Sequence, residues 1–181
     1  MSTKKGGRSI DNDILTGLVE IRPYVFECCS FKDTKLALPD TLRKIGSNSF
    51  VQCNMEIIVI PGSVKIIEDW AFYSCDNLRD ITIENGVEYI SDRAFHKTAI
   101  SSIKIPESVR FMGLNAFSGC KNLKEIQIPS SLKIFEDKDN LVFNFKSHNI
   151  DNTLANSIVY DAENFEYMLN CMESRVKVNI Y

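Results

Sequence analysis

A phrase of about 23 residues recurs five times along this chain of 181 residues, and every copy carries a phenylalanine at the same place. These residues are Phe26, Phe50, Phe72, Phe95 and Phe117, separated by steps of 24, 22, 23 and 22 residues. Such a period is typical of a stacked solenoid. Because so short a unit cannot bury a core alone, each copy must pack on its neighbours. The spacing therefore predicts an elongated repeat protein with one continuous hydrophobic core.

Each copy contains an alternation of apolar residues that indicates one strand. The paired inward positions are Leu36 and Leu38, Ile58 and Ile60, Ile81 and Ile83, Ile103 and Ile105, and Ile126 and Ile128. Proline follows in four copies, and Glu84 takes its place in the remaining one. Since proline has no amide hydrogen, the strand is expected to end there. We expect the strands of successive copies to lie side by side in a parallel sheet.

Cysteine occupies one position of the repeat, three residues after the phenylalanine. The residues in this column are Cys29, Cys53, Cys75, Thr98 and Cys120. Neighbouring rungs lie about 5 Å apart, but parallel side chains in register do not converge as a disulfide requires. We therefore favour buried free thiols over disulfide bridges, although six cysteines in a secreted chain would ordinarily suggest bridges.

This pattern resembles the BspA-like leucine-rich repeat family, whose unit approximates Leu-x-x-Ile-x-Ile-Pro-x-Ser-Val-x-x-Ile-Gly-x-x-Ala-Phe-x-x-Cys. Residues 78–95 and 100–120 match this unit closely, and the resemblance covers about residues 18–132. It implies a mainly β fold with minor α structure, a right-handed leucine-rich-repeat solenoid with parallel strands and about five repeats. It also implies a surface used for protein binding or adhesion, with no catalytic residues carried over from the family.

The chain is predicted to have three parts. Residues 1–14 form a flexible N-terminal tail, residues 15–135 the repeats, and residues 136–181 a C-terminal α/β capping segment made of strand, helix and strand. In the last part Leu141, Phe143 and Phe145 alternate like a strand, and residues 157–160 and 176–180 resemble two more. Between these two, Phe165, Met168, Leu169 and Met172 share one face of a helix. This segment should seal the last rung, and a helix groove that binds a partner is the alternative.

Composition limits the classes of partner. A net charge of -3 and a pI near 5.5 disfavour nucleic acid, because phosphate binding needs a concentrated basic face. No apolar stretch is long enough to span a bilayer, and residues 1–17 lack the apolar middle of a signal peptide. As written, the chain is expected to be cytoplasmic and not inserted in a membrane. If a leader was removed, the cell surface or the medium is expected instead.

The sequence carries no recognisable enzymatic motif. There is no Cys-x-x-Cys pair, no glycine-rich phosphate loop and no nucleophile elbow. A dyad of Cys171 and His148 is conceivable, but an ordinary helix thiol and a loop imidazole are the favoured interpretation. We therefore expect no catalytic, cofactor-binding or metal-binding residues, and no cofactor.

One departure from the family unit marks a candidate partner-binding site. The residue before the inward isoleucine that follows the turn is usually polar, yet here four consecutive copies carry Ile66, Tyr89, Phe111 and Ile134. At about 5 Å per rung these residues would make a stripe about 15 Å long, either an exposed interface or a second core layer. Trp70 stands in an otherwise polar column and is a candidate anchor for the same patch.

The sequence thus predicts a non-enzymatic scaffold for protein-protein interaction or adhesion, with a protein partner of unknown identity. Two alternatives belong to other classes: a carbohydrate or surface-polymer binding module, and a self-assembling structural solenoid. Glycan binding is less favoured because the outward columns of the strand face contain no aromatic residue. Self-association would make the mass in solution depend on concentration.

Overall fold

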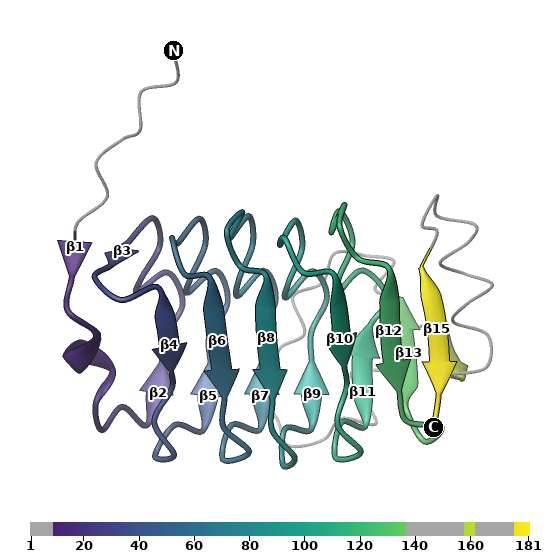
Figure 1. Cartoon of the computed structure of the whole chain (residues 1–181). Helices are drawn as coiled ribbons and strands as arrows, with labels where there is room; N and C mark the ends of the chain where they lie inside the picture. Colours follow the sequence, from purple (N-terminus) through teal and green to yellow (C-terminus); the bar gives the residue numbers. More distant parts are fainter. Residues whose placement is uncertain (1–8, 137–157, 162–175) are drawn as a thin grey trace.

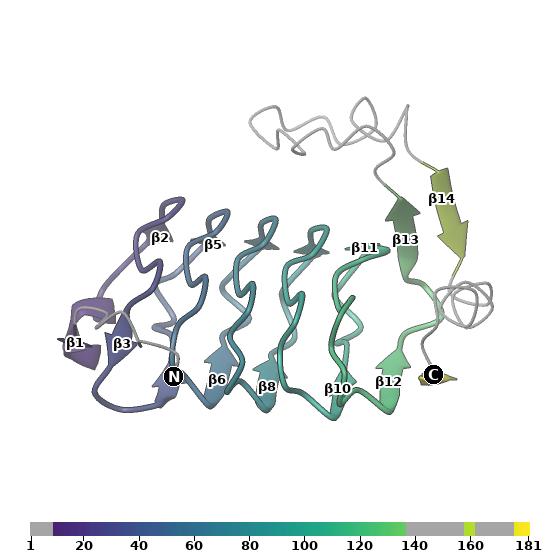
Figure 2. The ribbon, with the colours of Figure 1, turned by 90° about the horizontal axis from the view of Figure 1, so that it is seen from above.

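The computed structural model describes residues 9–136, 158–161 and 176–181. These residues wind as a right-handed β-solenoid whose coils stack side by side (Figure 1). Each repeat descends in a front strand, turns at the lower edge, rises in a rear strand and turns again at the upper edge. Figure 2 looks down on the upper turns, with the front and rear strands on opposite sides of the core. The predicted solenoid of parallel strands is confirmed.

The rear sheet runs the length of the solenoid without a break. Its seven strands follow the order β14-β13-β11-β9-β7-β5-β2. The parallel ones are β2 (Glu20–Ile21), β5 (Lys44–Ile45), β7 (Ile66–Ile67), β9 (Tyr89–Ile90), β11 (Phe111–Gly113) and β13 (Lys133–Glu136). β14 (Ile158–Asp161) pairs antiparallel with β13 and closes the sheet at its C-terminal end.

The front face consists of two parallel sheets of three strands each. The first contains β4 (Lys35–Ala37), β6 (Ile57–Ile60) and β8 (Asp80–Ile83). The second contains β10 (Ser102–Lys104), β12 (Glu125–Ile128) and β15 (Lys177–Ile180). Within each sheet, equivalent isoleucines of neighbouring coils pair in register. The expected single front sheet is therefore interrupted between β8 and β10.

A file of stacked phenylalanine rings forms the core beneath the upper turns. Phe50, Phe72 and Phe95 are fully buried. The centroids of the Phe72 ring and of its two neighbours are 5.1 Å apart, with interplanar angles of 4° and 2°. Phe26 and Phe117 extend the file at 5.3 Å on either side. The repeat spacing therefore predicted both the burial and the alignment of these rings.

The two ends differ from the interior coils. Residues 9–14, which the sequence assigned to a flexible tail, form β1 (Ser9–Ile10) and most of the short 3₁₀ helix η1 (Asn12–Leu15). β1 pairs with β3 (Ser30–Phe31), so the prediction of a flexible tail is wrong for residues 9–14, and residues 1–8 lie outside the described residues. At the other end, β14 and β15 confirm two of the expected strands. The predicted helix between them and the strand around Phe143 lie outside the described residues.

Cys53, Cys75 and Cys120 of the cysteine column are buried and Cys29 is half-buried, and no disulfide joins any two of the described cysteines. The thiols of Cys53 and Cys75 donate to the carbonyl oxygens of Phe26 and Phe50, each at 2.9 Å. Burial raises the pKa of Cys75 to about 12, and it also raises the pKa values of Cys53 and Cys120. These thiols act as small packing groups that tie one coil to the preceding one.

We expect a thiol reagent to separate these cysteines in the folded protein. At mildly alkaline pH, exposed Cys28 should react at least about 100-fold faster than Cys53, Cys75 and Cys120, because the reactive thiolate is scarce and buried at those three sites. Peptide mapping by mass spectrometry after timed labelling would measure this difference, with Cys28→Ser as the control. Equal labelling of Cys75 and Cys28 in the folded protein would contradict it.

Candidate partner-binding surface

Three of the predicted contact residues lie together on the outer side of the rear sheet. Ile66, Tyr89 and Phe111 occupy neighbouring strands and pair in register. The rings of Tyr89 and Phe111 stack with their centroids 5.6 Å apart and their planes 4° from parallel. The following residues in the strands, Ile67 and Ile90, are fully buried and point into the core. The structure therefore forms the first three rungs of the expected stripe.

The stripe is only partly accessible. Ile66 and Phe111 are half-buried, and Tyr89 is only 9% exposed. Ile134 does not belong to the stripe, because it pairs with Met112 and is fully buried. The prediction for Ile134 is wrong because the turn before β13 is one residue shorter than in the other coils. Ile134 therefore takes the inward position that Met112 has in the preceding coil. With Tyr89 and Ile134 buried, the stripe resembles a second packing layer more than an open contact surface.

Trp70 lies in a different place, on the upper turn that follows β7. Its ring centroid is 5.0 Å from that of Tyr73 and 5.4 Å from that of His96. Tyr73 and His96 stack on each other at 5.5 Å, with 24° between their planes. These contacts group Trp70 with residues that the sequence interpretation missed, and not with Tyr89 or Phe111. The three rings, Arg93 and Lys97 are called the turn-edge cluster below.

The repeat explains why these side chains meet. Trp70 and Arg93 each precede the phenylalanine of their coil by two residues, while Tyr73 and His96 each follow it by one. Because neighbouring coils stack in register, residues of one column come into contact. The sequence does contain a sign of this cluster. In the position directly after the phenylalanine, two adjacent copies carry a ring, that of Tyr73 and that of His96.

Two cations cover the aromatic rings of the cluster. The Arg93 guanidinium lies 5.0 Å from the centre of the Trp70 ring, and the Lys97 ammonium lies 5.6 Å from that of Tyr73. Such contacts contribute about 0.5–1 kcal/mol each at exposed sites. Arg93 also forms an ion pair with Asp92 at 2.9 Å. Lys97 is exposed, and within the described part of the chain no carboxylate lies within ion-pair distance of it.

His96 contributes a ring without a third positive charge. Burial lowers its pKa, and the nearby charges of Lys97 and Arg93 lower it further. The imidazole is therefore neutral at pH 7, and its Nδ1 lies 2.5 Å from the hydroxyl of Ser118 in the next coil. This hydrogen bond fixes the ring on which Tyr73 stacks.

The backbone at Trp70 is held in the left-handed region, with φ at 57°. Asn48 and Arg93, in the same column of adjacent coils, have φ values of 56° and 54°. This conformation costs an L-residue about 1–2 kcal/mol, and a bulky ring is seldom found there. Because several coils share this conformation, the upper turn imposes it whatever the side chain, and the contacts of the Trp70 ring with Tyr73 and His96 hold the ring in place.

The part of the chain that the structure covers contains neither a candidate metal site nor a helix that could span a membrane. Among residues 9–136, 158–161 and 176–181, no group of three or more histidine, cysteine or acidic side chains is placed to hold a metal ion. Within the same ranges, no helix has the length and apolar character needed to cross a membrane.

A family model described as "BspA type Leucine rich repeat region (6 copies)" matches residues 19–147. No curated protein matches the chain. Two solved structures are similar to it. A leucine rich cell surface protein from Faecalibacterium prausnitzii A2-165 has 23% identity and a TM-score of 0.44, and the match covers 73% of this chain and 40% of that one. A leucine-rich repeat protein from Bacteroides ovatus ATCC 8483 has 18% identity and a TM-score of 0.38, with coverage of 65% and 51%. This chain thus spans about half the length of these proteins or less.

Proposed function

Because the chain belongs to the BspA-type leucine-rich repeat family, we propose that it is a non-enzymatic scaffold that binds a protein partner through the turn-edge cluster. The strongest support is the group of three rings around Trp70, held together by two neighbouring coils and flanked by two cations. Tryptophan, tyrosine and arginine are the residues that most often dominate the free energy of binding at protein interfaces.

The arrangement of the cluster suits binding for a second reason. The Trp70, Tyr73 and His96 rings already contact one another, so little side-chain freedom is lost when a partner covers them. Lys97 adds an exposed charge that can pair with an acidic group of the partner. The role is compatible with either compartment predicted from the sequence, the cytoplasm or the cell surface.

Carbohydrate or surface-polymer binding is the second candidate. The strand face has no aromatic residue in its outward columns, but the upper turns bring Trp70 and Tyr73 into contact. The apolar face of a sugar packs well on such rings, while Arg93 and Lys97 could pair with its acidic substituents. This candidate uses the same cluster and therefore predicts the same loss in a Trp70 variant.

A Trp70→Asn variant tests the proposal, because asparagine occupies this column in two other coils and tolerates the left-handed backbone. We expect at least about 30-fold weaker retention of a specific partner, the loss typical of a binding hot spot. Affinity capture from the lysate of the source organism with quantitative mass spectrometry would measure it. Tyr24→Asn is the matched control, since Tyr24 lies in the same column with φ at 62° and is 60% exposed.

The outcomes separate the two candidates. Loss of a protein from the Trp70→Asn eluate, with Tyr24→Asn unchanged, supports protein binding. If a polysaccharide extract displaces the captured material, or if only glycans are retained, carbohydrate binding is supported instead. Equal capture by both variants and the parent protein would refute a role for the cluster.

A further inference from the structure

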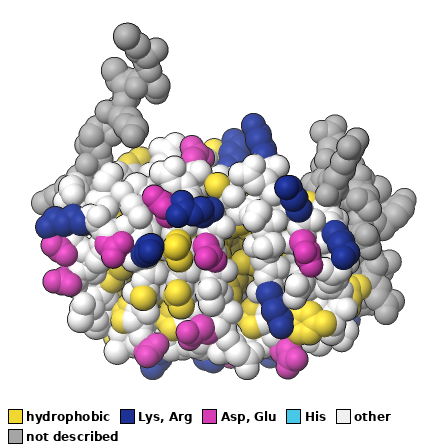
Figure 3. Space-filling model, in the orientation of Figure 1, with side chains coloured by type: hydrophobic (Ala, Val, Ile, Leu, Met, Phe, Trp, Pro, Cys, Tyr) yellow, Lys and Arg dark blue, Asp and Glu magenta, His cyan; other side chains and the backbone are white. Residues whose placement is uncertain are grey.

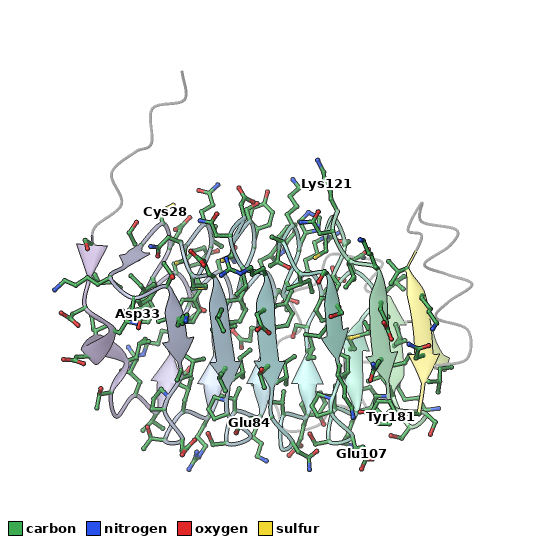
Figure 4. The ribbon with its side chains drawn as sticks, in the orientation of Figure 1. Cys28, Asp33, Glu84, Glu107, Lys121 and Tyr181 are labelled. Carbon is green, nitrogen blue, oxygen red and sulfur yellow. The ribbon has the colours of Figure 1, made fainter. Side chains whose placement is uncertain are left out.

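Basic side chains are concentrated in two consecutive coils, those that contain Phe95 and Phe117. Residues 93–124 include six lysine and arginine side chains but a single carboxylate, that of Glu107, although the whole chain has a net charge of -3. Glu107 lies at the lower edge of the solenoid, whereas Lys121 lies at the upper edge (Figure 4). The positive charge of these coils is therefore separated from their acidic group by the height of the solenoid.

Four of the six cations belong to the upper turns of these coils. We call them the basic turn patch: Arg93, Lys97, Lys121 and Lys124. Figure 3, in the orientation of Figure 1, shows lysine and arginine side chains gathered at the upper edge, to the right of the middle. The other two cations lie against aromatic rings elsewhere, Lys104 at 4.6 Å from the centre of the Tyr181 ring and Arg110 at 5.9 Å from that of Phe111.

The lysines of the basic turn patch are exposed and have no acidic partner in the described part of the chain. Arg93 pairs with Asp92, but no described carboxylate lies within ion-pair distance of Lys97, Lys121 or Lys124. Neighbouring coils are about 5 Å apart, well within the Debye length of about 8 Å at physiological salt, so these like charges repel one another. An acidic partner would relieve that repulsion.

Gly119 brings the two upper turns into close contact. Its φ is +70°, and a Cβ built on it would lie 2.9 Å from Cγ of Lys97 and 3.2 Å from Cε1 of His96. Because Gly119 has no side chain, the stem of Lys97 and the ring of His96 can lie against the next coil. The Lys97 N–H also donates to the Ser118 carbonyl at 3.0 Å. The basic turn patch is thus continuous with the rings of the turn-edge cluster.

We propose that the basic turn patch binds an acidic segment of the protein partner, whose aspartate or glutamate side chains pair with Lys97, Lys121 and Lys124. This inference rests on the proposed function, because it names the chemistry of the partner that covers Trp70. Charge complementarity is the main support, since three unpaired ammonium groups lie on two adjacent turns beside a ring surface.

The spacing of the coils suits such a segment. Alternate side chains of an extended chain lie on one face about 6.6 Å apart. Lysine carries its charge on a flexible four-carbon stem, so two carboxylates of one segment can reach the cations of both coils. The segment would then run along the upper edge and continue over the rings of Tyr73 and Trp70.

NMR titration of the full chain with a blocked peptide of four glutamates tests the proposal. The amide signals of Lys97, Gly119 and Lys121 should shift and reach saturation. The apparent affinity should fall at least about tenfold as the ionic strength rises from about 0.01 M to about 0.1 M, because the Debye length shrinks from about 30 Å to about 10 Å. A blocked peptide of four glutamines is the neutral control and should shift none of these signals.

The imidazole of His96 gives a second readout. A carboxylate bound beside the ring favours its charged form, so the pKa of His96 should rise when the glutamate peptide binds, from the value that burial and the two nearby cations have lowered. The glutamine peptide should leave this pKa unchanged. The chain has one other histidine, so a His148→Asn variant identifies the signal of His96.

Two pairs of substitutions locate the binding charges. Lys97→Gln combined with Lys121→Gln should weaken binding of the glutamate peptide at least about fivefold, because two exposed ion pairs are lost. Lys32→Gln combined with Lys35→Gln removes the same charge from exposed positions near the N-terminal end and should leave binding unchanged. Equal weakening by the two pairs, or equal binding of the glutamine peptide, would overturn the proposal. The peptide comparison uses the parent protein and does not depend on how the variants fold.

The same reagents separate this inference from the proposed function. A partner that is lost with Trp70→Asn but retained fully by the Lys97 and Lys121 variant would overturn the acidic segment and leave the proposed function in place. Saturable binding of the glutamate peptide, with capture unchanged in Trp70→Asn, would support the basic turn patch and refute the role of the rings. Polygalacturonate fragments that bind more tightly than the glutamate peptide would overturn the proposal in favour of an acidic glycan.

Discussion

Phe72→Ala is expected to lower the free energy of unfolding by about 3–5 kcal/mol, the range for truncating a buried aromatic side chain. The Phe72 ring is fully buried and stacks on a ring of each adjacent coil at 5.1 Å, so its loss leaves a cavity shared by three coils. Urea unfolding followed by circular dichroism would measure the change. This position is therefore among the most sensitive in the core.

Two companion variants make this result specific. Phe117 is 8% exposed, and within the described residues only Phe95 stacks on its ring. Phe117→Ala should therefore cost less than Phe72→Ala. Phe72→Leu keeps most of the apolar volume and should cost about 1–1.5 kcal/mol. If Phe72→Ala lowered stability by less than Phe117→Ala, the file of rings could not be the central element of the core.

Gly86→Ala is expected to destabilise the protein by about 2–5 kcal/mol, from two sources that add. The φ of Gly86 is +123°, where an L-residue is strained by about 1–2 kcal/mol. The added methyl group would also meet the Gly62 carbonyl oxygen at 2.2 Å, and the backbone shift that relieves this contact typically costs about 1–3 kcal/mol. The midpoint of urea unfolding reports the sum.

Gly17→Ala is the matched control for this experiment. Gly17 also has a positive φ of +74°, but a Cβ added there meets no atom within 4 Å. Gly17→Ala should therefore lower the free energy of unfolding only by the backbone strain, about 1–2 kcal/mol. The difference between the two glycine variants measures the close approach of the coils that contain Gly62 and Gly86. Equal losses of stability in the two variants would contradict the prediction, because they would mean that the contact between the added methyl group and the Gly62 carbonyl oxygen costs nothing.

The solenoid could be predicted from the sequence because its core depends on columns and not on any single residue. Five phenylalanines at nearly constant spacing leave little freedom, so Phe50, Phe72 and Phe95 had to align once the coils stacked. Ile134 shows where the same reasoning fails. The last coil is one residue shorter at the lower turn, between β12 and β13, and in a strand a shift of one residue moves a side chain from the surface to the core.

The candidate sites were less predictable, for physical reasons that differ. Trp70 was recognisable from its column, but its contacts with Tyr73 and His96 depend on which columns face each other across an upper turn. The break in the front face between β8 and β10 has no signature in the strands themselves, since both strands carry the same alternating isoleucines as the other copies. Hydrogen bonding between coils depends on their spacing to within about an ångström, which a pattern of apolar residues does not encode.

The break in the front face also bears on how the molecule responds to load. A pull along the solenoid axis is resisted by strand ladders on two faces between most coils, but between the coils of β8 and β10 the front ladder is missing, and only the rear ladder and the hydrogen bonds of the turns resist it. Tension would therefore concentrate at one level of the molecule and bend it backward there before any coil unwinds. A protein of this shape, tethered at its ends, would yield at its middle.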